Sequence, residues 1–185
     1  KAQNAEAAGA SGVVIFNEGQ EGRTDAFLGT LGGPGATVPV VGANFNVGVE
    51  LAAGGVTVRM FVNATSEIRP TQNVLAETPG GRDDRVVVVG AHLDSVPVGP
   101  GIQDNGSGSA AILEIALQMA AQEIEPRNQV RFAWWGAEES GLLGAQHYVD
   151  NLSARETKNI ALNLNFDMIV SPNCVRFVYD GDGSV

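Results

Sequence analysis

Apolar and polar residues in the second half of the chain follow two different periods. Residues 86–90 form an unbroken apolar run dominated by β-branched side chains, which is typical of a central strand covered on both faces. Residues 129–135 and 160–167 alternate with a period of two, which predicts two further strands. Residues 108–121 and 142–151, which lie between the strands, have the pattern of helices. Strands that alternate with helices predict an α/β fold with a mostly parallel or mixed sheet, helices on both faces and right-handed crossovers.

The chain before about Pro70 has shorter apolar runs, which Gly, Pro and Asn residues separate. Three runs predict the strands of a small β-rich unit: residues 12–16, 38–41 and 56–62. Residues 47–53 predict one or two helical turns, and residues 2–10 resemble the end of a helix, so we expect upstream sequence to be missing. This region contains no His or Cys and its acidic residues are scattered, so we expect no catalytic site in it.

Composition narrows the class of protein. With 44% hydrophobic and 17% charged residues among 185, the chain can bury a sizeable core, which argues against disorder and coiled coil. The net charge of -10 argues against nucleic acid as a partner. Residues 26–49 carry no charge, but Gly, Pro and Asn interrupt them, so we expect no membrane-spanning helix. A single cysteine, Cys174, excludes an internal disulfide and a multi-thiolate metal site.

Side chains able to bind a metal follow the three predicted strands or precede the first predicted helix. They are His92 and Asp94 after the first strand, Asp104 before the helix, Glu138 and Glu139 after the second strand, and Asp167 at the end of the third. Because ligand sites in open α/β sheets lie at the carboxyl ends of the strands, we expect these groups to meet. Nitrogen and oxygen donors of this kind bind zinc in catalytic sites.

Each of these residues also has a purely structural interpretation. Asp104 can cap the helix that follows it, Glu138 and Glu139 can complement a helix dipole, and Asp167 can belong to a turn. Convergence from three strands favours a shared site over these separate roles. Of the adjacent pair Glu138 and Glu139, one can bind a metal while the other accepts protons. We expect His147, inside an amphipathic helix, to be structural.

Four motifs occur in order along this half of the chain: Gly90-Ala91-His92-Leu93-Asp94-Ser95, Gly101-Ile102-Gln103-Asp104-Asn105-Gly106-Ser107-Gly108, Trp135-Gly136-Ala137-Glu138-Glu139-Ser140-Gly141-Leu142-Leu143-Gly144 and Asn165-Phe166-Asp167-Met168. Together they resemble the zinc aminopeptidases of peptidase family M28, such as the secreted bacterial leucyl aminopeptidases and the vacuolar aminopeptidase Y type. The first region resembles the protease-associated (PA) domain that many members carry. The resemblance implies a partial PA domain over residues 1–70 and the N-terminal part of an M28 catalytic domain, an incomplete zinc-peptidase-like fold, over residues 71–185.

The resemblance also implies a metal site with two zinc ions (Zn²⁺) in the complete active site. Asp104 would bridge the two ions, His92 and Asp167 would complete the protein ligands of one ion, and Glu139 would bind the other. A further histidine ligand of the family lies well downstream of the Asn-Phe-Asp-Met motif, beyond Val185, so we expect this chain to be a fragment of a longer peptidase. The family also has a cis peptide bond after the bridging aspartate.

Two further residues would have catalytic roles in such a site. Glu138 would act as general base and acid, taking a proton from a metal-activated water and passing it to the leaving amine. Asp94 would orient the imidazole of His92. The implied function is that of an aminopeptidase acting on peptides or proteins with a free N-terminus, in a secreted or vacuolar location. The alternatives are a carboxypeptidase or glutaminyl cyclase relative with the same metal core, and a non-catalytic peptide-binding module.

Overall fold

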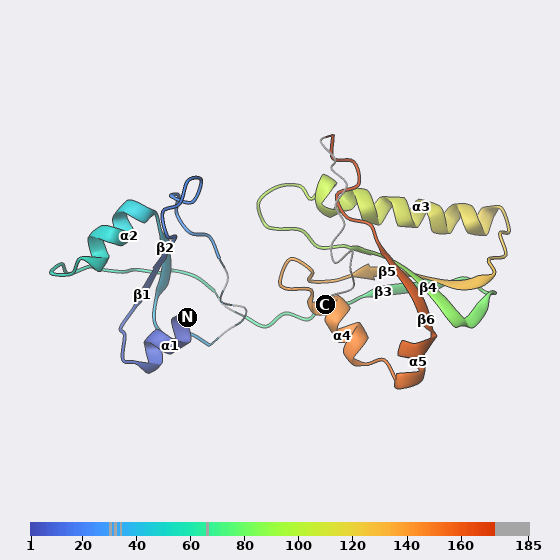
Figure 1. Cartoon of the computed structure of the whole chain (residues 1–185), viewed down its shortest axis with the longest axis horizontal. Coiled ribbons are helices and arrows are strands. Elements are labelled where there is room, and N and C mark those ends of the chain that lie inside the picture. Colours follow the sequence, from blue (N-terminus) through green and yellow to red (C-terminus); the bar gives the residue numbers. More distant parts are fainter. Residues whose placement is uncertain (30, 32, 34, 66, 173–185) are drawn as a thin grey trace. The chain divides into compact units, whose positions relative to one another are not determined.

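The computed structural model describes residues 1–172 apart from residues 30, 32, 34 and 66. The chain divides into two compact units, Lys1–Pro70 and Thr71–Val185 (Figure 1). Among the described residues, none of the helices combines the length and the apolar content that crossing a bilayer requires.

The first unit contains a small parallel sheet and two short helices. The elements are α1 (Ala2–Ala7), β1 (Val13–Phe16), β2 (Val40–Ala43) and α2 (Phe45–Ala52). Strands β1 and β2 pair in parallel, with Val13 opposite Val40. Helix α2 begins after Asn44, whose side-chain oxygen accepts a hydrogen bond from the Val47 amide at 2.9 Å. The first two predicted strands and the predicted helical turns of this unit are therefore confirmed.

The third strand predicted in this unit, residues 56–62, is wrong. The segment is not a strand, and no strand pairs with it in the described part of the chain. Val56, Val58 and Phe61 are 55%, 50% and 83% exposed. The alternation of apolar residues in this segment suits a strand, but a strand also needs a neighbour whose backbone groups satisfy its own. The periodicity of one segment carries no information about that neighbour.

The second unit is built on a four-stranded mixed sheet. Its strands are β3 (Val74–Glu77), β4 (Arg82–His92), β5 (Asn128–Trp135) and β6 (Ile160–Asn165). Their spatial order is β3-β5-β4-β6, with β4 parallel to both β5 and β6 and β3 antiparallel to β5. The three predicted strands of this half are confirmed. The sequence analysis missed β3, whose apolar run, residues 74–76, is only three residues long and whose four residues are all exposed.

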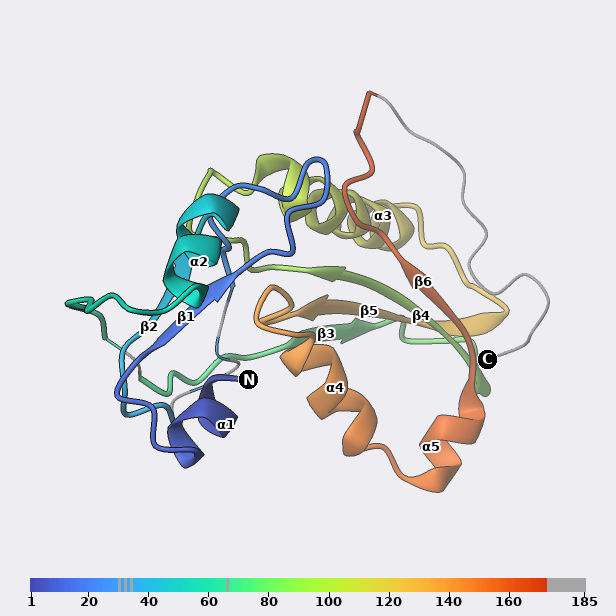
Figure 2. The same ribbon diagram turned by 60° about the vertical axis from the view of Figure 1, so that its left-hand side comes forward.

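Helices cover both faces of this sheet. Helix α3 (Gly108–Ala121) lies on one face, and α4 (Leu143–Asp150) and α5 (Ala154–Asn159) lie on the other (Figures 1 and 2). A helical turn, η1 (Ile102–Ser107), leads into α3. The mixed α/β fold with helices on both faces is therefore confirmed. The sequence analysis missed α5, although Ser153 and Glu156 form a capping box at its start.

Strand β4 lies at the centre because its two faces are both apolar. On the α3 side, the buried cluster consists of Val89, Ala91, Ile112, Phe132 and Trp134. On the α4 side, it consists of Val86, Val88, Ala133 and Trp135, against which Ala145 and Tyr148 pack. Gly90 lets the indole of Trp135 pack closely, since a Cβ at Gly90 would lie 2.6 Å from the indole nitrogen. This packing fixes the end of β4, where the candidate site begins.

Candidate metal centre

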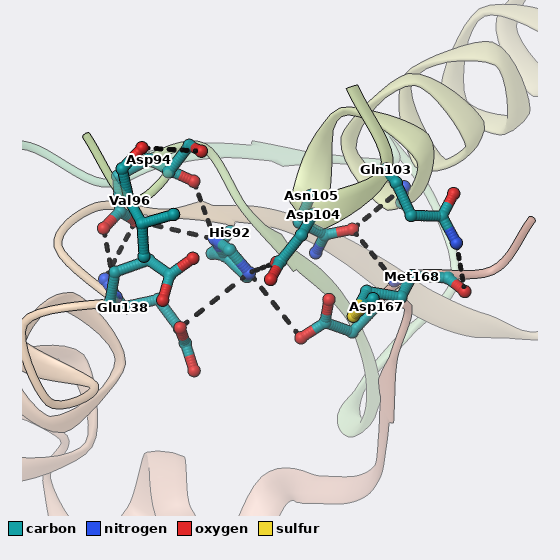
Figure 3. Close-up of polar contacts among 12 residues, drawn as sticks. His92, Asp94, Val96, Gln103, Asp104, Asn105, Glu138, Asp167 and Met168 are labelled. Atoms are coloured by element: carbon teal, nitrogen blue, oxygen red, sulfur yellow. Dashed lines mark hydrogen bonds and ion pairs between the residues drawn. The ribbon is translucent and has the colours of Figure 1, made fainter. Parts of the chain in front are cut away.

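The six predicted site residues meet at one edge of the second unit. His92 is the last residue of β4, and Asp94 follows it in the next loop. Glu138 and Glu139 lie in the turn after β5, and Asp167 lies two residues beyond the end of β6. Asp104 comes from η1. Because β4, β5 and β6 are parallel, their carboxyl ends bring these side chains together, as the sequence predicts (Figure 3).

The imidazole of His92 is the centre of the cluster. It is only 3% exposed, and its Nε2 atom faces three carboxylates (Figure 3). Nε2 lies 3.1 Å from Asp104 Oδ1, 3.6 Å from Asp167 Oδ2 and 3.8 Å from Glu138 Oε2. The ligand atoms of a tetrahedral zinc ion lie about 3.4 Å from one another, given metal–ligand bonds of roughly 2.0–2.2 Å. The separations from Asp104 and Asp167 match that spacing.

Two groups of side chains within the described residues have the arrangement that a metal ion requires. His92, Asp104 and Asp167 form one group, and His92, Glu138 and Glu139 form the other; within each group the ligand atoms all lie within 4.8 Å of one another. The Oε1 atom of Glu139 is buried and has no hydrogen-bond partner in the part of the chain that the structure describes. A buried carboxylate oxygen without a partner is costly, and a bound cation would satisfy it. The donor set therefore fits a metal.

The structure does not support the separate structural roles considered for Asp104, Glu138 and Glu139. The N-cap residue of α3 is Ser107, and the amide of Gly108, the first residue of α3, donates to Asn105 Oδ1 at 3.0 Å, so the helix start is bonded by Asn105 and not by Asp104. Helix α4 begins only at Leu143, and its first turn has no acidic residue. Glu138 and Glu139 therefore lie outside α4 and are not first-turn acids.

His147 belongs to neither group of candidate ligands. Its side chain is exposed in the last turn of α4, and its Nδ1 atom lies 3.3 Å from Asn151 Nδ2. It therefore serves as a natural comparison for His92 in tests of metal binding.

Asp94 contacts both His92 and the turn that carries Glu138 and Glu139. Its backbone carbonyl lies 2.9 Å from His92 Nδ1, whereas its carboxylate oxygen Oδ1 is 3.6 Å from the same nitrogen. The carboxylate instead accepts the backbone N–H of Glu138 at 2.8 Å through Oδ1 and that of Glu139 at 3.1 Å through Oδ2. Asp94 thus holds the imidazole through its main chain and the Glu138–Glu139 turn through its side chain (Figure 3).

Replacing Asp94 with alanine should weaken zinc binding. The variant keeps the carbonyl group beside His92 but loses both hydrogen bonds to the turn that carries Glu139. Losing an outer partner of this kind typically lowers metal affinity by about 10–100-fold. Zinc affinity measured by competition with a chromophoric chelator checks this, with Asp83→Ala, an exposed acid on β4, as the control. Equal affinity in Asp94→Ala and wild type would show that the two hydrogen bonds do not position Glu139.

The environment shifts the pKa of two groups in the cluster. Burial opposes the charge on His92, but its hydrogen bond to the Asp94 carbonyl and the carboxylates of Asp167, Glu138 and Asp104 together raise its pKa. Burial raises the pKa of Glu138; His92 opposes this, and the carboxylates of Glu139, Asp167 and Asp94 add to it. A carboxyl group with a raised pKa holds a proton more readily, which suits a group that exchanges protons.

Sequence reasoning missed two residues, Ser109 and Asn105, that bond to the backbone carrying the candidate ligands. Ser109 Oγ donates to the His92 carbonyl at 2.6 Å, which ties α3 to the end of β4. Asn105 is buried beside Asp104, and the peptide bond between the two is cis, as the resemblance implies. The available signal was the residue type of Asn105, because asparagine just before a predicted helix is a common capping residue.

Beside the cluster lies a hollow of about 360 Å³ between the sheet and α4. His92, Glu138 and Asp167 contribute its polar side, and Trp135, Leu142 and Tyr148 are among its apolar residues. The reactive groups thus face open space in which part of a ligand can lie.

Two family descriptions match the chain. That of peptidase family M28 matches residues 73–184, and that of the PA domain matches residues 1–51. An aminopeptidase of Pseudomonas aeruginosa is 50% identical over 189 aligned residues, which include 100% of this chain and 34% of the relative. The chain thus spans about a third of the length of this curated relative.

The chain is also similar to the solved structures of two aminopeptidases. A zinc aminopeptidase from Bacillus subtilis is 36% identical, with a TM-score of 0.59, over 91% of this chain and 40% of that one. An aminopeptidase from Aneurinibacillus sp. strain AM-1 is 35% identical, with a TM-score of 0.74, over 91% of this chain and 42% of that one. The M28 match covers more than half of the chain. The chain therefore belongs to peptidase family M28.

Proposed function

We propose that the protein containing this chain is a zinc-dependent aminopeptidase, which removes N-terminal residues from peptides or proteins. The observation that carries this proposal is the convergence of His92, three carboxylates and a Glu139 oxygen that has no hydrogen-bond partner among the described residues, at the carboxyl ends of three parallel strands. The similarity to a zinc aminopeptidase of Bacillus subtilis and to an aminopeptidase of Pseudomonas aeruginosa supports it.

We further propose roles for the two parts of the chain. Residues 1–70 are a partial PA domain, and residues 71–185 are the N-terminal part of the catalytic domain, in keeping with the ranges of the two family matches. The location that suits such an enzyme is extracellular, or vacuolar in a fungus.

The proposed metal ligands come from both groups of side chains. Asp104 would bridge two zinc ions, His92 and Asp167 would complete one ligand set, and Glu139 would contribute to the other. Zinc in such a site lowers the pKa of bound water and polarises a carbonyl group. Donor chemistry supports zinc, since histidine nitrogen and carboxylate oxygen are the usual ligands of catalytic zinc.

Glu138 is the proposed proton carrier. Its carboxylate accepts a proton from the attacking water and delivers it to the amine nitrogen as the peptide C–N bond breaks, so that one water adds across one peptide bond. The Asp94 carboxylate fixes the backbone of the turn on which Glu138 lies. Burial and the surrounding carboxylates, which raise the pKa of Glu138, favour this exchange of a proton.

Hydrolysis of an aminoacyl anilide by the full-length protein tests the proposal. We expect activity that a chelator abolishes and added zinc restores, together with no cleavage of the same substrate when its amino group is acetylated. Cleavage of the acetylated substrate would contradict an aminopeptidase. Release of C-terminal residues or cyclisation of N-terminal glutamine would assign the site to the carboxypeptidase or glutaminyl cyclase alternative, and zinc binding without any turnover would indicate a binding module.

A further inference from the structure

The side chain of Asn105 makes three hydrogen bonds from a buried position. The residue is 2% exposed. Its Nδ2 group donates to the Phe166 carbonyl at 2.9 Å. Its Oδ1 atom accepts from the Gly108 amide at 3.0 Å and from the Met168 amide at 3.4 Å. Both the donor and the acceptor of this carboxamide are therefore used.

The partners of Asn105 lie on both sides of one candidate ligand and beside another. Phe166 and Met168 directly precede and follow Asp167, while Asp104 is the residue before Asn105. One neutral side chain thus joins the backbone that carries Asp104 to the backbone that carries Asp167, although the two are far apart in sequence (Figure 3). The same side chain also accepts the amide of Gly108, the first residue of α3, which anchors this connection to the helix.

Neighbouring contacts strengthen the same connection. Gln103 Nε2 donates to the Met168 carbonyl at 3.0 Å, and the Ile169 amide donates to Ser107 Oγ at 3.2 Å. The start of α3 also approaches the Asp167 segment so closely that a Cβ at Gly108 would clash with the Phe166 carbonyl oxygen. The two segments are therefore held together at close range, and Asn105 is the buried centre of their contact.

We propose that Asn105 is a positioning residue: by bonding to the residues on both sides of Asp167, it fixes the Asp104 and Asp167 carboxylates at the spacing that a shared metal ion requires. This inference rests on the proposed function, since it concerns the same metal site. The residue is chemically suited to the role because an amide can donate and accept at once without adding charge to a cluster of carboxylates. Outer partners of metal ligands typically change metal affinity by about 10–100-fold when they are lost.

Two substitutions separate positioning from charge. Asn105→Asp keeps the shape and the acceptor oxygen, loses the donor to Phe166 and adds a negative charge near the site. Charge alone would tighten zinc binding, whereas loss of positioning weakens it, so the two effects have opposite signs. Asn105→Ala removes all three hydrogen bonds. The matched control is Asn44→Asp, the same change at the cap of α2 in the first unit.

The experiment measures zinc affinity of the full-length protein by chelator competition, together with thermal unfolding of the metal-free variants and the visible absorption of the Co²⁺-saturated proteins. We expect zinc affinity about 10–100-fold lower in both Asn105 variants and unchanged in Asn44→Asp. The Co²⁺ spectrum should change in the Asn105 variants, because its bands depend on ligand geometry. A role confined to stability would lower the melting temperature and leave the spectrum of the saturated protein unchanged.

The possible results differ in what they overturn. If wild type binds zinc and Asn105→Asp binds it equally well or more tightly, the positioning role is wrong while the proposed function stands. An unchanged Co²⁺ spectrum in both variants would also overturn the positioning role. If wild type binds no zinc, the proposed function fails and this inference fails with it. Where Asn105→Ala does not fold, the nearly isosteric Asn105→Asp decides alone.

Discussion

Glu138→Gln should lower the rate of peptide hydrolysis by about 10²–10⁴-fold, the usual contribution of a general acid–base group. Glutamine has nearly the same shape but cannot accept a proton from water or return one to the leaving amine. The Glu138 backbone N–H, which donates to Asp94, is retained, so the turn that carries Glu139 should keep its position. Steady-state hydrolysis of an aminoacyl anilide by the full-length protein, with zinc content measured on the same samples, checks this.

The control for this substitution is Glu125→Gln, an exposed glutamate outside both groups of candidate ligands. It should leave both activity and zinc content unchanged. The Oε2 atom of Glu138 is 3.8 Å from His92 Nε2, compared with 3.1 Å and 3.6 Å for the oxygens of Asp104 and Asp167. Loss of zinc in Glu138→Gln would assign the residue as a ligand, and unchanged activity would remove it from the mechanism.

Zinc added to the chelator-treated protein should raise its melting temperature by about 10 °C when free zinc is roughly a thousandfold above the dissociation constant. A ligand that binds only the folded state stabilises it by mass action, which amounts to about 4 kcal/mol at that concentration. The apo site brings four carboxylates near one histidine, so the cation also relieves repulsion between like charges. Thermal unfolding with and without zinc, monitored by circular dichroism, measures the shift.

The two histidines of the chain provide a matched pair for this experiment. His92→Ala removes the residue shared by both groups of candidate ligands and should abolish most of the zinc-induced shift. His147→Ala changes an exposed side chain of α4 and should leave the shift intact. A shift of equal size in the two variants would mean that the added zinc stabilises the protein from somewhere other than this cluster.

The fold could be predicted from sequence where a segment's own pattern decides its structure. The β-branched run at residues 86–90 required burial on both faces, and β4 lies at the centre of the sheet between clusters under α3 and α4. Two short elements were missed for a common reason. Strand β3 has four residues and α5 has six, and all of them lie outside the core. Segments this short that bury no face need no repeating apolar pattern, so periodicity does not reveal them.

The sequence by itself singled out the residues of the candidate site. Residue type, together with position after a predicted strand or, for Asp104, before a predicted helix, selected His92, Asp104, Asp167 and the Glu138–Glu139 pair, because parallel strands bring their carboxyl ends to one edge. Which of the two glutamates would bind metal and which would carry protons came only from the resemblance to family M28. The selection of these positions needs only local pattern and a general rule of sheet topology, whereas the separate role of each residue does not follow from them.

Only the tertiary structure decided how those groups are held. The Asp94 carboxylate bonds to the amides of Glu138 and Glu139, 44 and 45 residues away, and Asn105 bonds to the residues around Asp167, 61 and 63 residues away. The tertiary structure also decided that residues 56–62 have no partner strand in the described part of the chain. Hydrogen bonds between distant segments depend on where two backbones meet in space, and neither segment's sequence encodes that meeting point alone.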